Sequence, residues 1–205
     1  MYKLTDKQQN KIEHYKLSPE DYKAMFESME GIKKLIQLCG DDANREGLID
    51  SPFRFVKAMM EYTEGYKEDP GEHLQTTFDV DHDQMVIVKD ITFNSLCEHH
   101  FAPFYGVMHI GYIPNEKVTG LSKFGRLTDG YAKRFQVQER LTTQISNAIN
   151  EVLEPKGVMV VVEAKHMCMC GRGVKKRDAN TVTSSVEGVF KDNAQARNEF
   201  LSLIK

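Results

Sequence analysis

Residues 85–97, MVIVKDITFNSLC, are followed after residues 98–103 by a similar stretch, FYGVMHIGYIP, at 104–114. Both are rich in β-branched and aromatic residues, which favour strands. Two later stretches have the same character: VMVVVEAKHMCM at 158–169 and TVTSSVEGVF at 181–190. The sequence therefore predicts four strands in the second half of the chain.

Two helices are predicted between the second and third strands, over residues 122–135 and 138–154. Pro155 ends the second, whose apolar residues recur at helical spacing: Leu141, Ile145, Ala148, Ile149 and Val152. This order favours an α+β fold, with a four-stranded antiparallel sheet and both helices on one face. Such a sheet leaves two open edges, so we expect several subunits to join their sheets into a closed ring.

Residues 1–70 are predicted to form an N-terminal helical appendage to a domain over residues 71–205. Ser18 and Pro19 are typical of a helix start, and Gly40 of its end. The sequence Asp50-Ser51-Pro52 begins another helix. Residues 1–17 show no clear period, and we expect a frayed arm or a partner-dependent helix there.

Composition excludes several classes of protein. The 205 residues include 27 Lys and Arg against 30 Asp and Glu, a net charge of −3 that argues against nucleic-acid binding. There is no run of about 18 apolar residues and no signal-peptide pattern, so neither membrane insertion nor export is expected. Four cysteines are too few for a disulfide scaffold and suit a reducing interior. We therefore expect a cytoplasmic protein whose cysteines bind a metal or act in catalysis.

The densest cluster of metal-binding side chains is Cys97-Glu98-His99-His100, at the end of the first predicted strand. Zinc prefers thiolate and imidazole ligands, so Cys97 and either histidine can supply two of them. The segment HMCMC at 166–170 is the expected source of a third. In a regular strand its histidine and both cysteines would point to one face.

Spacing alone leaves the role of this metal open. A structural zinc would use Cys97, one histidine, Cys168 and Cys170, and a disulfide or plain buried thiols are further alternatives. A catalytic zinc is favoured, because each strand then has a spare histidine for proton transfer and the metal keeps a position open for water.

Two other segments indicate a small phosphorylated substrate. Residues 121–126, LSKFGR, combine a hydroxyl, two cations and free backbone N–H groups at a helix start, which suits phosphate. Residues 171–177 add four cations close to the presumed metal ligands. Glu139 either complements a helix dipole or accepts two hydrogen bonds from adjacent N–H groups, as guanine presents at N1 and its 2-amino group. Solvated surface helices also carry such charges, and this remains the alternative.

Taken in order, these motifs resemble those of GTP cyclohydrolase I, the zinc enzyme family that opens pteridine biosynthesis. The matching segments span residues 50 to 190: Ser51-Pro52-x-Arg54, Leu96 to His100, Gly120-Leu121-Ser122-Lys123-x-x-Arg126, Gln136 to Leu141, His166 to Met169, and Arg172-Gly173-Val174. The resemblance implies the tunnelling fold, in which sheets of neighbouring subunits form a barrel. Two pentameric rings then stack as a homodecamer with active sites between subunits.

The resemblance also implies a role for individual residues. The Zn²⁺ ligands are Cys97, His100 and Cys168. The catalytic group comprises the unligated His99 and His166, with Ser122 assisting later proton transfers. Glu139 anchors the guanine of GTP, with Gln138 beside it in the substrate site. The residues around the triphosphate are Ser122, Lys123, Arg126 and Arg172, with Arg54 and Lys57 as further contacts.

The implied reaction is hydrolysis of GTP at C8, release of formate and rearrangement to 7,8-dihydroneopterin triphosphate, without a redox cofactor. Two rival functions are open at this point. One is the 7-deazaguanine nitrile reductase of the same superfamily, which uses NADPH and a cysteine nucleophile without zinc. The other is a non-catalytic, zinc-stapled module that binds nucleotides.

Overall fold

The computed structural model describes residues 3–205, and the chain divides into two compact units, one ending at Glu61 and the other beginning at Tyr62. Residues 62–70, predicted as part of the appendage, pack within the second unit. There the Gly65 N–H donates to the Lys133 carbonyl, and the Arg134 side chain donates to the Gly65 carbonyl. No helix within residues 3–205 has the length and apolar character needed to cross a membrane.

The first unit is helical. Its α2 helix begins at Pro19, with Ser18 as its N-cap, and Gly40 follows the helix in the left-handed region at φ +90°, as predicted. The expectation of a frayed arm is wrong for the described residues 3–17. They include a helix, α1, whose last residue Ile12 is fully buried, because apolar contacts with α2 and α3 outweigh the weak local pattern. The elements are α1 (Asp6–Ile12), η1 (Glu13–Tyr15), α2 (Pro19–Leu38) and α3 (Ser51–Tyr62).

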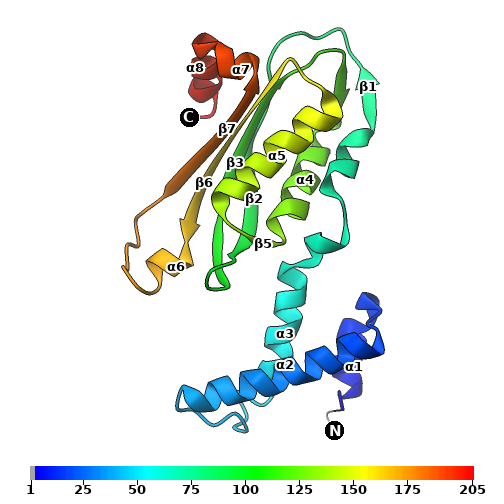
Figure 1. Ribbon diagram of the computed structural model, residues 1–205, viewed down its shortest axis with the longest axis vertical. Helices are drawn as coiled ribbons and strands as arrows, with labels where there is room; N and C mark the ends of the chain where they lie inside the picture. Colours follow the sequence, from blue (N-terminus) through cyan, green and yellow to red (C-terminus); the bar gives the residue numbers. More distant parts are fainter. Residues whose placement is uncertain (1–2) are drawn as a thin grey trace. The chain divides into compact units, whose positions relative to one another are not determined.

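The second unit is built on a mixed sheet with strand order β5-β2-β3-β6-β7 (Figure 1). The four predicted strands are confirmed as antiparallel neighbours: β2 (Val86–Cys97), β3 (Ala102–Ile113), β6 (Gly157–His166) and β7 (Thr181–Gly188). The description as a four-stranded antiparallel sheet was incomplete, because β5 (Phe135–Gln136) adds a parallel edge beside β2. Two residues are too few to show a strand pattern, and the same applies to the separate pair β1 (Thr77–Asp79) and β4 (Lys117–Thr119).

Both predicted helices, α4 (Ser122–Ala132) and α5 (Gln138–Leu153), cover one face of the sheet (Figure 1). The side chains of β6 alternate between the two faces of the sheet, which explains why the helices pack on one of them. Val158, Val160 and Val162 point into the core under these helices, whereas Met159 and Val161 belong to a second cluster. Short 3-10 segments, η2 (Glu64–Lys67) and η3 (Pro70–Gln75), precede the sheet.

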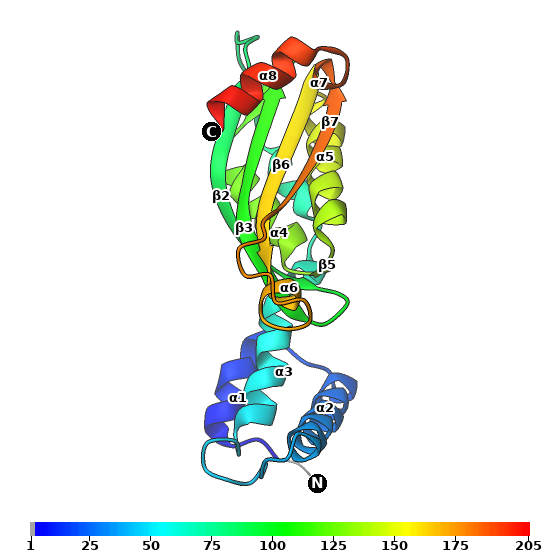
Figure 2. The ribbon, with the colours of Figure 1, turned by 90° about the vertical axis from the view of Figure 1, so that its left-hand side faces the viewer.

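The opposite face carries two C-terminal helices that the sequence analysis did not predict, α7 (Val189–Asp192) and α8 (Ala194–Leu203) (Figure 2). Phe190 and Phe200 bury their rings there against Met159 and Val161 of β6. The close approach requires Gly111 on β3, since a Cβ at that position would lie 2.5 Å from the Phe200 ring.

Candidate metal centre and active site

A tight turn brings the first predicted ligands together. β2 ends at Cys97, and its carbonyl accepts hydrogen bonds from the N–H groups of His100 at 3.3 Å and Phe101 at 2.8 Å. Phe101 lies in the left-handed region at φ +51°, which reverses the chain into β3. Cys97 is buried, whereas His99 and His100 are exposed on the turn.

The third ligand comes from a segment that departs from the prediction. The strand ends at His166, and Met167–Cys170 form a helical turn, α6, so the expected alternation of His166, Cys168 and Cys170 is wrong. A helical turn rotates successive side chains by about 100°. As a result Cys168 meets Cys97 and His100, while the Cys170 thiol donates to the Lys176 carbonyl at 3.4 Å.

The donor atoms of Cys97, His100 and Cys168 all lie within 4.8 Å of one another. A tetrahedral zinc with bonds of about 2.0–2.3 Å needs such donors roughly 3.5–3.8 Å apart, so this set fits zinc after small adjustments. Burial, and then the neighbouring Cys97 thiol, raise the pKa of Cys168. A cation held between the two sulfurs would favour the thiolate form of Cys168 and so offset both effects. Three protein ligands leave one position for water, the pattern of a catalytic rather than a structural zinc.

His166 lies beside this cluster in a defined setting. Its ring stacks on Phe104, with centroids 4.7 Å apart and an interplanar angle of 2°. Its Nε2 is 2.8 Å from Oε1 of Gln138, a residue only 1% exposed. Burial lowers the pKa of His166, and the charge of Glu139 acts in the opposite direction. His99 also lies beside the cluster, with Nδ1 3.6 Å from the Cys97 sulfur.

A cavity of about 230 Å³ unites these groups. It therefore contains two of the three predicted metal ligands, both predicted catalytic histidines and the predicted guanine anchor. Its lining is Cys97, His99, Val137, Gln138, Glu139, His166, Cys168, Met169 and Thr181. The volume is small for a nucleotide site, since ligand pockets commonly measure about 300–1,000 Å³.

The predicted phosphate residues at the start of α4 lie elsewhere. Phe124 of α4 packs on Tyr112 of β3, with ring centroids 5.4 Å apart, whereas His166 packs on Phe104 near the other end of the same strand. Eight strand residues span roughly 27 Å. One chain therefore does not bring the cavity together with this group, which comprises Ser122, Lys123 and Arg126.

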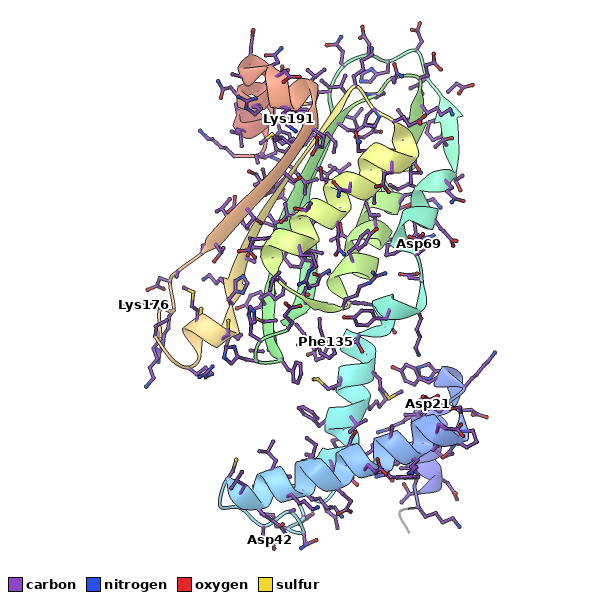
Figure 3. The ribbon with its side chains drawn as sticks, in the orientation of Figure 1. Asp21, Asp42, Asp69, Phe135, Lys176 and Lys191 are labelled. Carbon is purple, nitrogen blue, oxygen red and sulfur yellow. The ribbon has the colours of Figure 1, made fainter. Side chains whose placement is uncertain are left out.

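The remaining predicted phosphate contacts are also outside the cavity lining. Arg172 is exposed in the segment that joins α6 to β7, where Figure 3 labels Lys176. Arg54 and Lys57 belong to α3 of the first unit, and they pair with Asp50 and Glu61 respectively.

The sequence analysis missed the contacts that support the site. Arg140 of α5 donates two hydrogen bonds to the Glu98 carboxylate, at 2.6 and 3.0 Å, and thereby lowers the pKa of Glu98. This bidentate pair ties the ligand-bearing turn to the helix that carries Glu139. Phe104 was likewise missed, because nothing in the strand pattern distinguishes it from other core residues.

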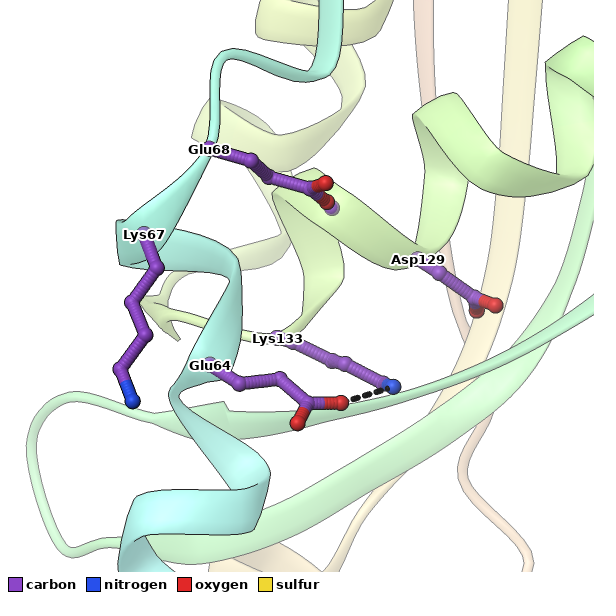
Figure 4. Close-up of a pocket in the computed structure, with 6 residues that line it drawn as sticks. Glu64, Lys67, Glu68, Asp129 and Lys133 are labelled. Carbon is purple, nitrogen blue, oxygen red and sulfur yellow. Dashed lines mark hydrogen bonds and ion pairs between the residues drawn. The ribbon is translucent and has the colours of Figure 1, made fainter. Parts of the chain in front are cut away.

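A second cavity, of about 330 Å³, contains none of the predicted site residues (Figure 4). Lys133 and Glu64 form an ion pair in it, with Nζ and Oε1 2.6 Å apart. Withdrawal from water raises the pKa of Asp129, and the charges of Glu64 and Glu68 add to this while Lys133 opposes it. The residues that line the larger cavity include no thiol or imidazole, and its carboxylates are not among the described groups placed to hold a metal ion, so size does not identify the active site here.

Comparison with known proteins identifies the family. Residues 28–205 match the family described as GTP cyclohydrolase I. Proteins named GTP cyclohydrolase 1 from Bacillus mycoides strain KBAB4 and Bacillus cereus strain B4264 are each 55% identical over 175 residues, covering 85% of this chain and 93% of each relative. A solved structure described as the apo form of an archaeosine synthase, QueF-Like, aligns with a TM-score of 0.42 and 18% identity, over 51% of this chain and 93% of that one. By the family match and the identity to these relatives, the chain belongs to the GTP cyclohydrolase I family.

Proposed function

We propose that this chain hydrolyses GTP at C8 of the guanine, releases formate and forms 7,8-dihydroneopterin triphosphate. The observation that carries the proposal is the convergence of two thiols, an imidazole and two further histidines around one cavity that also presents Glu139. This is the chemistry that hydrolysis at an amidine-like carbon needs: an activated water and groups that transfer protons.

In this proposal Cys97, His100 and Cys168 hold zinc. Zinc bound there supplies a water activated for attack at neutral pH. His99 and His166 lie beside the ligands and donate or accept the protons that move during ring opening, since an imidazole nitrogen can release or take up a proton. Ser122 is proposed to assist later proton transfers.

Glu139 is proposed to hold the guanine. It lines the cavity at the start of α5, next to His166 in space, and its carboxylate can accept two parallel hydrogen bonds. Adenine does not offer the same pair of donors, so this contact discriminates between GTP and ATP. Gln138 lines the same wall and was predicted with it.

The complete active site is proposed to form between two copies of the chain, within a homo-oligomer, which we expect to be a decamer of two stacked pentamers. Along β3, roughly 27 Å separate Phe104, which contacts His166, from Tyr112, which contacts Phe124 of α4, and this supports the arrangement. A neighbouring copy would bring its Ser122, Lys123 and Arg126 to the triphosphate, and Arg172 would add charge.

The test is to incubate the purified protein with GTP and measure formate together with pterin fluorescence after oxidation, with and without a zinc chelator. We expect activity that the chelator removes. Cys97→Ser should abolish it, and the matched variant Cys170→Ser should retain it, because Cys170 lies outside the ligand cluster. Oxidation of NADPH without formate release would support the nitrile reductase instead.

Complementation tests the shared site. Cys97→Ser and Arg126→Ala should each inactivate the homo-oligomer. Mixed oligomers made by co-expression should regain part of the activity, because some interfaces then pair an intact cavity with an intact phosphate group. Mixed oligomers that remain inactive would contradict a site built from two chains.

A further inference from the structure

The orientation of one buried amide can be determined from its partners. Gln138 is the first residue of α5, and its Nε2 lies 3.0 Å from the carbonyl oxygens of Val162 and Thr181 and 3.1 Å from Oγ1 of Thr183. Carbonyl oxygens only accept hydrogen bonds, so the atom facing them is the NH₂ group. The amide oxygen is therefore the atom that faces Nε2 of His166, at 2.8 Å.

Two threonines make this orientation consistent throughout the network. The Thr142 hydroxyl donates to the backbone carbonyl of Gln138 at 2.7 Å, which uses its single hydrogen. The oxygens of Thr142 and Thr183 are 2.7 Å apart, so Thr183 is the donor of that bond. The Thr183 oxygen then still has a lone pair that faces the Gln138 NH₂ group, whose two hydrogens are shared among the three acceptors.

We propose that Gln138 is a positioning residue that fixes the proton of neutral His166 on Nε2 and leaves Nδ1 as the nitrogen that exchanges protons in the reaction. An amide oxygen cannot donate, so Nε2 must be the donor. The two nitrogens of an imidazole point away from each other, and Phe104 lies flat against the ring and holds its plane. The Gln138 side chain therefore acts on the reaction through His166.

The role of Nδ1 in catalysis rests on the proposed function, whereas the position of the proton does not. The position can be measured by solid-state NMR on sedimented, zinc-loaded full-length protein labelled with ¹⁵N-histidine, at a pH where His166 is neutral. The His166 signals are those absent from His166→Asn. We expect a protonated Nε2 and a bare Nδ1, and a proton on Nδ1 would overturn the proposal.

Variants test the cause. Gln138→Leu removes the amide oxygen that accepts from Nε2. The ratio of the tautomer protonated on Nδ1 to the tautomer protonated on Nε2 should therefore rise roughly tenfold, which is the effect of about one hydrogen bond. The control is Gln144→Leu, on the same helix, whose Oε1 accepts from Gln136 at 2.8 Å without reaching His166. It should leave the His166 signals unchanged. Equal shifts in both variants, or none in Gln138→Leu, would refute the role of Gln138.

The kinetic readout separates the two proposals. Gln138→Leu should lower kcat for formate release about tenfold, because the change acts through His166. Absence of any formate release, with the proton on Nε2, would refute the function but retain the positioning. If Gln138→Leu fails to fold, Thr183→Val replaces it and should give a smaller change in the His166 ¹⁵N signals, whereas Thr183→Ser should give the wild-type spectrum. In every case the ¹⁵N spectrum of the wild-type protein shows by itself which nitrogen of His166 carries the proton.

Discussion

Phe104 is expected to support catalysis as well as the core, and Phe93 provides a matched control. Both side chains are almost fully buried, at 0% and 2% exposure, and their rings contact each other edge to face at 5.9 Å. Only Phe104 also lies flat against His166. Phe104→Leu and Phe93→Leu therefore remove the same aromatic pair, but only the former removes the platform under the histidine.

The magnitudes follow from these contacts. Replacing a buried phenylalanine by leucine costs about 1.5 kcal/mol in packing, and loss of the aromatic pair costs about a further 1 kcal/mol, so Phe93→Leu should lose about 2.5 kcal/mol of stability. Phe104→Leu also loses the stacking on His166, which is worth about 1 kcal/mol, so this variant should lose about 3.5 kcal/mol of stability. If this support is expressed in the transition state, Phe104→Leu should lower kcat about fivefold, and Phe93→Leu should leave it near the wild-type value.

The assay combines urea unfolding with steady-state formate release from GTP, with all variants at one protomer concentration because oligomerisation contributes to apparent stability. Destabilisation of both variants, with a fall of kcat in Phe104→Leu alone, would support the reasoning. An equal fall of kcat in both variants would refute it, because activity would then follow core stability rather than the setting of His166.

Three further predictions concern the histidines of the metal centre, the recognition of guanine, and Asp129 in the second cavity. His100→Ala should lose bound zinc by elemental analysis, whereas His99→Ala should keep zinc and lose formate release by roughly 100-fold or more; the reverse pattern would exchange their roles. Glu139→Ala should weaken GTP binding by roughly 100-fold and remove most of the preference over ATP in competition binding, and an intact preference would exclude Glu139 as the guanine anchor. Burial raises the pKa of Asp129 above its ordinary 3.8, so its charge at neutral pH destabilises the fold, and this cost is relieved as the pH falls through the folded-state pKa. Because Asp129 is partly exposed, solvent screening keeps this cost small, so Asp129→Asn should raise the free energy of unfolding at pH 7 by about 0.5 kcal/mol or less. The gain should disappear below pH 3.8, the ordinary pKa of the group; a gain that persists in acid would contradict the pKa shift.

Local sequence was sufficient for the elements whose signals are local. The start of α2 at Ser18 and Pro19 depends on capping within one turn of the chain, and β2, β3, β6 and β7 are long enough to show their residue preferences. The same reasoning could not find β5, because a two-residue strand exists only through its pairing with β2. It also missed α8, whose Phe200 is buried only because Gly111 leaves space on a distant strand.

The candidate site divides in the same way. The residue types and the motifs identified Cys97, Cys168 and the histidines as the groups with metal and proton-transfer chemistry, since that chemistry belongs to the side chains themselves. Spacing alone could not choose between His99 and His100; the family resemblance favoured His100, and the tertiary structure brings its imidazole to the two thiols. Only the tertiary structure showed that a helical turn removes Cys170 from them. The pairing of His166 with Gln138 is likewise tertiary, because it joins the end of a strand to the start of a helix 28 residues away, and no local pattern encodes such a contact.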